Sequence, residues 1–239
     1  MPFDGTPTSR CEQCPISACC MGTELNSSAP NRCARLLRGE HIFRSGDRAP
    51  YVYMVRKGAV KTYILSTDGE EQIISFLSPG DIAGIDTFGH TSQTRNAMAL
   101  EDSEVCRLPL DNLVNACTRN PGLHSRIMDA VSREVHRLQS MLKMERMTAE
   151  QRIAMFLLNQ ARRQAGQGHD LPLVHLAMTR GDIGRFLDLA VETVSRNLTR
   201  LQSLGYILVD RNTIELLDSE RLQQLARGRP AAGGAAVAA

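Results

Sequence analysis

The sequence lacks the features that place a protein in or across a membrane. Among its 239 residues, no run approaches the roughly 18 consecutive apolar residues that a membrane-spanning helix needs. The N-terminus also lacks the charged, apolar and small-residue segments of a secretory signal peptide. Hydrophobic residues make up 42% and charged residues 23% of the chain, as in ordinary folded proteins. These features favour a cytoplasmic protein, and the length allows two domains with separate cores.

The familiar sequence patterns of enzymes are missing as well. There is no P-loop, no dinucleotide-binding glycine motif and no Ser/His/Asp constellation, and the six histidines are dispersed. These absences argue against an enzyme. A large excess of one charge is also missing, since the net charge is +2 at pH 7. The charge of the whole molecule therefore gives no reason to expect nucleic-acid binding, and such a role must rest on local pattern.

The most informative stretch comprises residues 179–205, which have the pattern of two short helices joined by a tight turn. Thr179 and Asp182 are spaced like the N-cap and its reciprocal partner in a capping box at the start of the first helix. The second helix is predicted over residues 191–204, with an apolar inner face formed by Val194, Leu198 and Leu201. A helix-turn-helix of this kind places its second helix in the DNA major groove.

The segments around this stretch complete a winged helix-turn-helix domain, which is predicted over residues 148–227. A capping box with the sequence TAEQ at residues 148–151 opens a helix before the motif. Two short strands are predicted after the motif, over residues 206–209 and 213–216, and they form the wing. The last residues, 228–239, have the composition GRPAAGGAAVAA and are predicted to be a disordered tail.

Between residues 40 and 109 the pattern is that of an all-β domain. Short β-rich runs (YVYMV, VKTYIL, QIISFL, AMAL and EVCRL) are punctuated by glycines eleven or twelve residues apart. Asp68–Gly69 lies between two of these runs and predicts a hairpin. A β-roll sensor domain is thus predicted over residues 23–121. Residues 21–38, which lead into this domain, are predicted as loop with a helical turn around residues 34–37.

A long helix is predicted over residues 122–147. Apolar residues recur along it at alternating spacings of three and four, as on the a/d seam of a coiled coil. The seam consists of Met128, Val131, Val135, Leu138 and Leu142. Because charged residues lie off this narrow stripe, we interpret the segment as a dimerisation helix; the alternative is a helix that packs on its own domain. A dimer is also what a helix-turn-helix protein needs to read two half-sites.

The chain has seven cysteines, of which four fall within ten residues near the N-terminus and three stand apart. The cluster consists of Cys11, Cys14, Cys19 and Cys20, and the others are Cys33, Cys106 and Cys117. Structural disulfides are rare in the cytosol, where such a cluster more often serves metal or redox chemistry. Residues 1–22 are therefore predicted to form a cysteine-rich, cluster-binding arm, and Cys33 and Cys117 are predicted to be core or loop thiols.

Several stretches of the chain carry a family resemblance: CEQCPISACC, FRSGD, LSPGDIAGIDTFG, SEVCRLP and, most specifically, MTRGDIGRFLDLAVETVSR. Together they resemble the CRP/FNR superfamily of bacterial transcription factors, and within it the oxygen-sensing fumarate–nitrate regulator branch. The resemblance covers about residues 11–225. It implies an α+β fold with an N-terminal cyclic-nucleotide-binding-like β-roll, a long dimerisation helix and a C-terminal winged helix-turn-helix. It also implies a transcriptional activator of oxygen-responsive genes that works as a homodimer.

The same resemblance implies an oxygen-labile 4Fe–4S cluster that promotes dimerisation and DNA binding. Its ligands would be Cys11, Cys14, Cys20 and Cys106, which supply the four thiolates that such a cluster requires. The spacing of Cys11 and Cys14 alone suits zinc equally well. The family spacing selects Cys20 over the adjacent Cys19. Zinc, a thiol-based switch and the absence of any cofactor are the alternatives.

For DNA contacts, the resemblance implies that Glu192, Ser195 and Arg196 read base edges in palindromes with TTGAT-like half-sites. An arginine can bond bidentately to guanine, and a glutamate can accept a hydrogen bond from cytosine. The spacing of the three residues puts them on one face of the helix. Thr193 and Arg200 are candidates for phosphate contacts, which position a protein on DNA without specifying sequence.

The remaining partner predictions concern the β-roll. The branch that binds cyclic AMP needs a Gly-Glu pair and an Arg-Ser pair around its phosphate-binding turn. The corresponding region here, residues 80–99, has no Gly-Glu pair, and Asn follows Arg95 in place of Ser. A cyclic nucleotide is therefore not expected.

The acidic loop over residues 65–71 is a candidate contact with RNA polymerase, the alternative being an ordinary hairpin tip. Double-stranded DNA and a second copy of the chain are the main expected partners, and no membrane is expected.

Overall fold

The structure, a computed structural model, describes residues 32–144, 146–165 and 173–228, which form two compact units. The first unit extends to Gln139 and the second begins at Ser140. The predicted arm, residues 1–22, lies outside the described residues, as does the predicted tail apart from Gly228. Among the described helices, none is long and apolar enough to cross a membrane.

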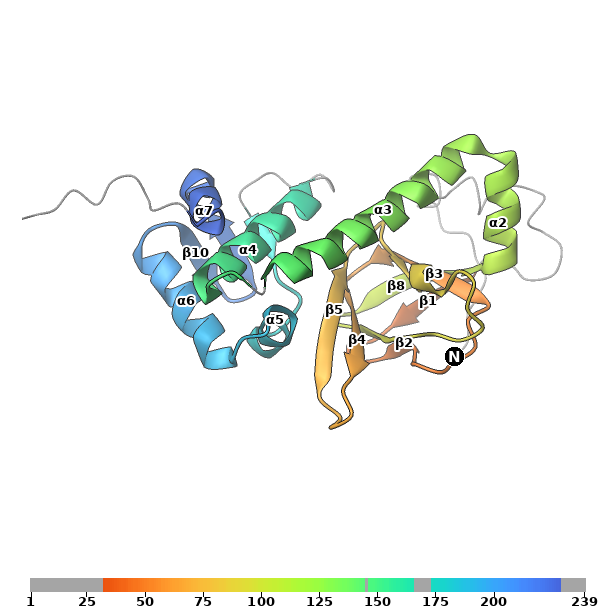
Figure 1. Ribbon diagram of the computed structural model, residues 1–239, viewed down its shortest axis with the longest axis horizontal. Helices are drawn as coiled ribbons and strands as arrows, with labels where there is room; N and C mark the ends of the chain where they lie inside the picture. Colours follow the sequence, from red (N-terminus) through yellow and green to blue (C-terminus); the bar gives the residue numbers. More distant parts are fainter. Residues whose placement is uncertain (1–31, 145, 166–172, 229–239) are drawn as a thin grey trace, which may run out of the picture. The chain divides into compact units, whose positions relative to one another are not determined.

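The first unit contains a β-roll of two antiparallel four-stranded sheets (Figure 1). One sheet has the strand order β1-β8-β3-β6 and the other has the order β2-β7-β4-β5. The first comprises β1 (Arg32–Leu36), β8 (Ser103–Pro109), β3 (Tyr51–Lys57) and β6 (Ile82–Ala83). The second comprises β2 (His41–Phe43), β7 (Asn96–Ala99), β4 (Val60–Leu65) and β5 (Glu71–Leu77). Every β-rich run predicted from the sequence is therefore a strand.

Strand β3 shows how the roll is held together. Val52 and Met54 point to one side, where they share a core with residues of the two following helices. Tyr53 and Val55 point to the other side, where they pack against the second sheet. Side chains alternate along a strand, so a strand that is covered on both faces is apolar throughout. Each such aliphatic side chain contributes about 1.5–3 kcal/mol when fully buried.

The prediction of a helical turn around residues 34–37 is wrong. Residues 32–36 form β1, which pairs with β8 along its whole length. Ala34 and Leu36 are buried while Arg35 is exposed, which is the two-residue period of a strand at a sheet edge. The composition of this segment favours a helix, but pairing with an adjacent strand outweighs such a weak local preference.

Two helices cover the first sheet. A short one, α2 (Leu110–Arg119), leads into the long α3 (Pro121–Met144), which corresponds to the helix predicted over residues 122–147. Leu123 and Ile127 of α3 are buried in the same core as Val52 and Met54. The first half of α3 is thus fixed to the roll; in Figure 1 it runs along the upper side of the strands, with α2 at the right.

The second unit is a winged helix-turn-helix. It begins with α4 (Ala149–Ala165), and its three-stranded sheet has the order β10-β11-β9. The remaining elements are β9 (Leu173–His175), α5 (Arg180–Leu187), α6 (Val191–Ser203), β10 (Ile207–Asp210), β11 (Thr213–Leu216) and α7 (Ser219–Ala226). The capping box at the start of α4 is confirmed, because Thr148 and Gln151 exchange hydrogen bonds of 2.8 and 3.3 Å. With both units in place, the predicted α+β fold class is confirmed.

Candidate nucleic-acid interface and thiol centre

The start of α5 is fixed by the predicted capping box. The hydroxyl of Thr179 accepts from the backbone N–H of Asp182 at 3.0 Å, and the Asp182 carboxylate accepts from the backbone N–H of Thr179 at 3.0 Å. Asp182 is buried, and Arg185 lies 3.3 Å from its second carboxylate oxygen. Two backbone donors that have no partner within the helix are thereby satisfied, which fixes the point where α5 begins.

The turn between α5 and α6 is equally constrained. Asp188 has φ 54° and ψ 55°, a left-handed conformation that Asp tolerates better than most residues. A Cβ atom on Gly184 would lie 2.5 Å from the carbonyl oxygen of Leu189, so the chain passes too close for any side chain there. The guanidinium of Arg152 donates to the carbonyl of Leu187 at 2.8 Å. The turn is therefore anchored to α4, and the direction of α6 is set by the fold.

Helix α6 separates a buried face from an exposed one. Val194, Leu198 and Leu201 are buried in the second unit, as predicted. On the opposite face Glu192, Ser195 and Arg196 are exposed. Neither Glu192 nor Arg196 has a side-chain hydrogen bond or ion pair with any described residue. The three candidate base-reading residues thus form one polar surface whose donors and acceptors are open to a ligand.

The predicted phosphate contacts lie on the flank of this surface. Thr193 is half-buried, and its carbonyl accepts a hydrogen bond from the Asn197 side chain. Arg200 is exposed and forms an ion pair with Glu150 of α4 at 3.4 Å. An exposed pair of this kind contributes little, so Arg200 can exchange Glu150 for a phosphate at small cost.

A residue that sequence reasoning passed over lies at the start of α5. Arg180 is half-buried, and its Nη1 atom is buried without a hydrogen-bond partner among the described residues. This burial lowers the pKa of the Arg180 guanidinium. The sequence did contain a sign of this residue: Arg180 directly follows the N-cap. The N-terminus of a helix favours negative charge, so a cation at this position indicates a role other than helix stabilisation.

In the first unit the structure brings together two cysteines that the sequence did not connect. Cys33 on β1 and Cys106 on β8 are directly opposite each other in the antiparallel pair, with their Sγ atoms 2.7 Å apart. Cys106 is buried and Cys33 is half-buried. The Arg56 guanidinium donates to the Cys33 sulfur at 3.2 Å. The hydrogen bond with Cys106 and the adjacent Arg56 lower the pKa of the Cys33 thiol to about 6, against the opposing effect of burial.

Of the predicted cluster ligands, Cys106 alone lies within the described residues; Cys11, Cys14 and Cys20 lie outside them, as does Cys19. A thiol held on a strand is the type of donor that an iron–sulfur cluster takes, so Cys106 fits the role of one ligand. The described part of the chain has no group of three or more His, Cys, Asp and Glu residues suited to a metal ion. Cys33 is a second thiol at this place, and its contact with Cys106 was missed because residues 21–38 were predicted as loop and not as a strand that pairs with β8.

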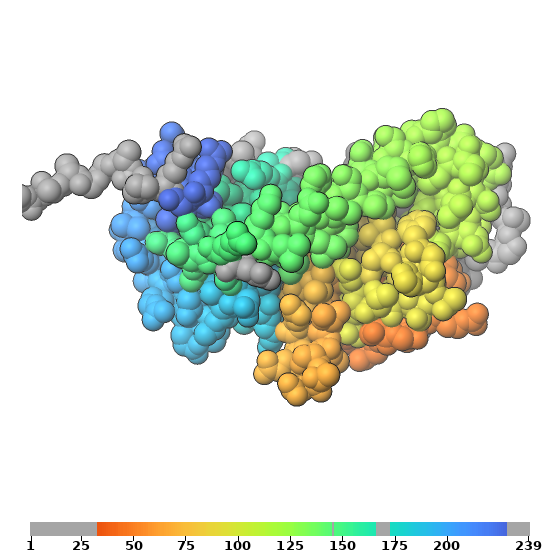
Figure 2. Space-filling view, in the orientation of Figure 1, coloured from red at the N-terminus to blue at the C-terminus, as the bar shows by residue number. Residues whose placement is uncertain are grey.

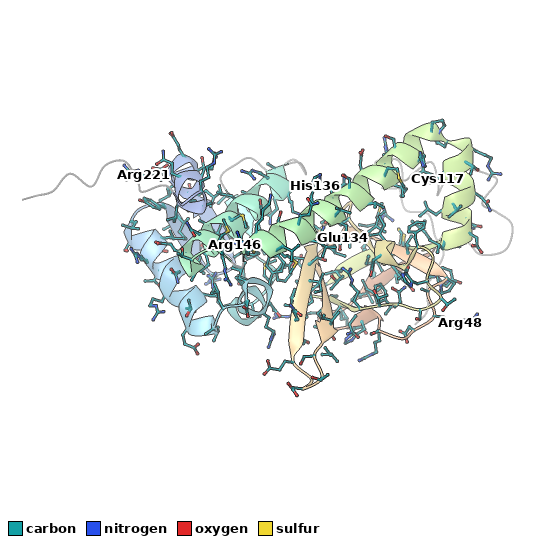
Figure 3. All side chains as sticks on the ribbon, viewed as in Figure 1. Arg48, Cys117, Glu134, His136, Arg146 and Arg221 are labelled. Atoms are coloured by element: carbon teal, nitrogen blue, oxygen red, sulfur yellow. The ribbon has the colours of Figure 1, made fainter. Side chains whose placement is uncertain are left out.

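The region equivalent to a phosphate-binding turn is occupied by ion pairs. Arg95 lies 2.9 Å from Asp86 and 2.9 Å from Glu134 of α3, and Glu134 also pairs with Arg137 at 2.6 Å. Glu134 lies on the side of α3 that faces the strands (Figure 3). The cavity beside Glu134 and Arg137 has a volume of about 10 Å³, which is the space of about one water molecule. Arg95 is thus committed to neighbours of the chain itself.

The predicted dimer seam is exposed in the single chain. Met128, Val135, Leu138 and Leu142 are large apolar residues with 39–68% of their surface accessible. Val131 is half-buried against the core of the roll. The predicted acidic loop, residues 65–71, forms the tip of the β4–β5 hairpin, which projects from the first unit in Figure 2 (orange).

The fold and these surfaces define a winged helix-turn-helix regulator with a β-roll sensor domain. Comparison with known families supports this class. The family described as "Cyclic nucleotide-binding domain" matches residues 34–120, and the family described as "Crp-like helix-turn-helix domain" matches residues 151–225.

Individual similar proteins place the chain more closely within this class of regulators. The "Anaerobic regulatory protein" of Pasteurella multocida is 37% identical over 223 residues, covering 90% of this chain and 82% of that protein. The "Fumarate and nitrate reduction regulatory protein" of Escherichia coli is 35% identical, covering 90% of each chain. The structure of FixK2 from Bradyrhizobium japonicum superposes with a TM-score of 0.74 at 30% identity, covering 86% of this chain and all of that one.

The chain therefore belongs to the CRP/FNR family of transcriptional regulators, with relatives named as anaerobic and fumarate–nitrate regulators. The family assignment made from the sequence motifs is confirmed. Regulators of this family bind DNA, are typically dimers and are not enzymes.

Proposed function

We propose that this protein is an oxygen-responsive transcriptional regulator of anaerobic genes, gated by an oxygen-labile 4Fe–4S cluster. The observation that carries the proposal is the exposed polar face of α6, combined with a thiol anchored at Cys106 in the sensor domain. The names of its relatives, which refer to anaerobic regulation, support the same function.

The output of the proposed mechanism is base recognition by α6. Arg196 would donate two hydrogen bonds to the O6 and N7 atoms of one guanine, and Glu192 would accept from the N4 amino group of a cytosine. Both side chains are exposed and have no partner among the described residues, so neither must break a bond to reach DNA. Ser195 on the same face would complete the reading of a TTGAT-like half-site. Arg180, Thr193 and Arg200 would contact phosphates.

The input is a cluster held by Cys11, Cys14, Cys20 and Cys106. Their four thiolates would hold the cluster, which when bound would supply the iron–sulfur core that oxygen destroys. Cys106 is opposite Met54 of β3, and Met54 shares a buried core with Ile127 of α3. A change at Cys106 is therefore connected to the dimerisation helix through close-packed side chains, which transmit small displacements.

The dimer would form along the seam of α3. The exposed apolar side chains of Met128, Val135, Leu138 and Leu142 follow one stripe, while Leu123 and Ile127 hold another stripe of the same helix on the roll. An apolar stripe that stays exposed on a single chain indicates an interface with another chain.

Two further aspects concern the roll. The ion pairs of Arg95 with Asp86 and Glu134 support a sensor domain that does not take up a cyclic nucleotide. The exposed hairpin tip at residues 65–71 is the proposed contact with RNA polymerase.

Purification without oxygen tests the proposal. The expected product is a brown protein with about four irons and four sulfides per chain, which binds a TTGAT palindrome tightly. Exposure to air should bleach it and abolish both dimer formation and specific DNA binding. A colourless zinc protein, or a protein that binds the palindrome equally before and after air, would contradict the proposal and favour the zinc or cofactor-independent alternative.

A further inference from the structure

Cys33 and Cys106 have the geometry of a pair of cysteines that can form a disulfide. Residues directly opposite each other in an antiparallel pair have Cα atoms about 4.5–5.5 Å apart. A disulfide spans Cα atoms about 4.4–6.8 Å apart. Cys33 and Cys106 are such an opposite pair, and their sulfur atoms already face each other at 2.7 Å. The backbone of β1 and β8 therefore needs no large movement for the two sulfurs to be joined.

The two sulfurs differ in access. Cys33 lies on β1, which is an edge strand, and its side chain is half-buried, whereas Cys106 lies on the inner strand β8 and is only 3% exposed. Arg56 directs its guanidinium at the Cys33 sulfur, at 3.2 Å. A cation beside a sulfur stabilises negative charge that develops there during oxidation. Cys33 is thus placed to meet an oxidant first, and Cys106 is placed behind it.

We propose that Cys33 and Cys106 form a reversible disulfide when the protein meets hydrogen peroxide or an organic hydroperoxide. In the first step the Cys33 thiolate attacks one peroxide oxygen. The O–O bond breaks, Cys33 becomes a sulfenic acid, and the leaving oxygen takes a proton to give water or an alcohol. In the second step the Cys106 sulfur attacks Cys33; the S–S bond forms, the S–O bond breaks, and the hydroxyl leaves with the Cys106 proton as water. The thiols lose two electrons in total, and the peroxide accepts them.

The consequence for regulation rests on the proposed function above. A sulfur that is bound in a disulfide cannot ligate iron, because ligation requires the thiolate. The disulfide would withdraw Cys106 from the cluster and keep the protein in its metal-free form until a thiol reductant restores it. The sensor would then respond to peroxide separately from oxygen, and only while no cluster is bound.

The first experiment maps the bond on full-length, reduced, metal-free protein and needs neither iron nor DNA. After peroxide treatment and alkylation of remaining thiols, trypsin cleaves after Arg32, Arg35, Arg95 and Arg107. We expect residues 33–35 linked to residues 96–107, and their release by dithiothreitol. The same cross-link should form in Cys117→Ser, the matched control, and should be absent in Cys33→Ser. A Cys106 that stays alkylatable, or that links to another cysteine, would overturn the proposal.

The second experiment separates this proposal from the proposed function. Metal-free wild-type protein is treated with peroxide and then given ferrous iron and sulfide without oxygen, with and without prior dithiothreitol. We expect cluster formation only after reduction, whereas Cys33→Ser should load its cluster in both cases. If reduced wild-type protein loads no cluster, the proposed function fails while the cross-link mapping still decides on the disulfide. A Cys33→Ser protein that never loads a cluster would make Cys33 a ligand and overturn its role as a competitor.

Discussion

Arg196 is the proposed base contact that a single substitution tests most directly. Its guanidinium is exposed on α6 and has no partner among the described residues, so its full hydrogen-bonding capacity is available to a base. We expect Arg196→Ala to weaken binding to the palindrome by about 1–3 kcal/mol and to relax the preference at one guanine. Fluorescence anisotropy with a set of singly substituted half-sites measures both effects.

Two control variants sharpen this result. Arg196→Lys keeps the charge but loses the planar fork, so it should behave like Arg196→Ala at that guanine. Arg162→Ala removes an exposed arginine from the last turn of α4 and should leave recognition unchanged. If Arg196→Ala instead weakened all sequences equally, Arg196 would be a phosphate contact and not a base contact.

Gly184 is the residue that permits the tight turn between α5 and α6. A Cβ there would lie 2.5 Å from a backbone carbonyl oxygen, which cannot move away as a flexible side chain can. Gly184→Ala should therefore destabilise the second unit by about 1–3 kcal/mol, the usual cost of overpacking. Gly181 is in the same helix, and a Cβ there would find its nearest neighbour at an ordinary 3.7 Å. Gly181→Ala should be neutral or slightly stabilising in chemical denaturation, and equal effects of the two changes would contradict this account.

At the scale of elements, the sequence predicted those segments whose local pattern and tertiary role agree. Five strands of the roll (β3, β4, β5, β7 and β8), the caps of α4 and α5 and the inner face of α6 were predictable for this reason. Strand β1 was not, because residues 32–36 become a strand only through pairing with β8, more than sixty residues away. The contact between Cys33 and Cys106 depends on that register, so no spacing in the sequence could reveal it.

Helix α3 carries two apolar stripes, and only one was predicted. Leu123 and Ile127 pack on the roll, while Leu138 lies on the exposed seam. Leu138→Glu should weaken the dimer, since it places like charges opposite each other at the interface. Gln139→Glu adds the same charge one residue away, at an exposed position off the seam, and should have little effect. Sedimentation velocity over a range of concentrations distinguishes the two, and an unchanged Leu138→Glu dimer would refute the seam.

Arg95 joins the roll to α3 through partly buried ion pairs. Its side chain and that of Glu134 are 15% and 14% exposed. Arg95→Met would leave Asp86 and Glu134 without this cation, although Thr94 still donates to Asp86 and Arg137 still pairs with Glu134. We expect a loss of roughly 1–3 kcal/mol in the free energy of unfolding, less than for a fully uncompensated buried charge.

Arg35→Met is the control: it removes an exposed pair with Glu104 and should change the free energy of unfolding by less than about 1 kcal/mol. Urea denaturation followed by circular dichroism compares them, and equal losses would contradict the role of Arg95.

At the scale of the whole molecule, the proposed sensor site and the proposed DNA-reading surface lie in different units. A signal between them must therefore pass through the chain that connects the units, which is α3. Cys106 is on β8, and the side chains next to it lead through Met54 to α3. The polar face of α6 is positioned by the capping box of α5 and by the turn at Asp188, both of which lie in its own unit. Oxygen should therefore change how many chains bind together and leave the affinity of a single α6 for its half-site unchanged.

This separation gives a test that distinguishes gating from recognition. Without oxygen, Cys106→Ser should lose tight binding to the palindrome because it lacks one of the proposed cluster ligands, whereas Cys117→Ser should keep it. On a DNA with one half-site, wild type and both variants should bind equally weakly, since the dimer provides no second contact there. Electrophoretic mobility shifts under anaerobic conditions measure both affinities on the same protein samples. A Cys106→Ser protein that also loses half-site binding would show that the sensor acts on the shape of the second unit itself, and the dimer would no longer be the step that oxygen controls.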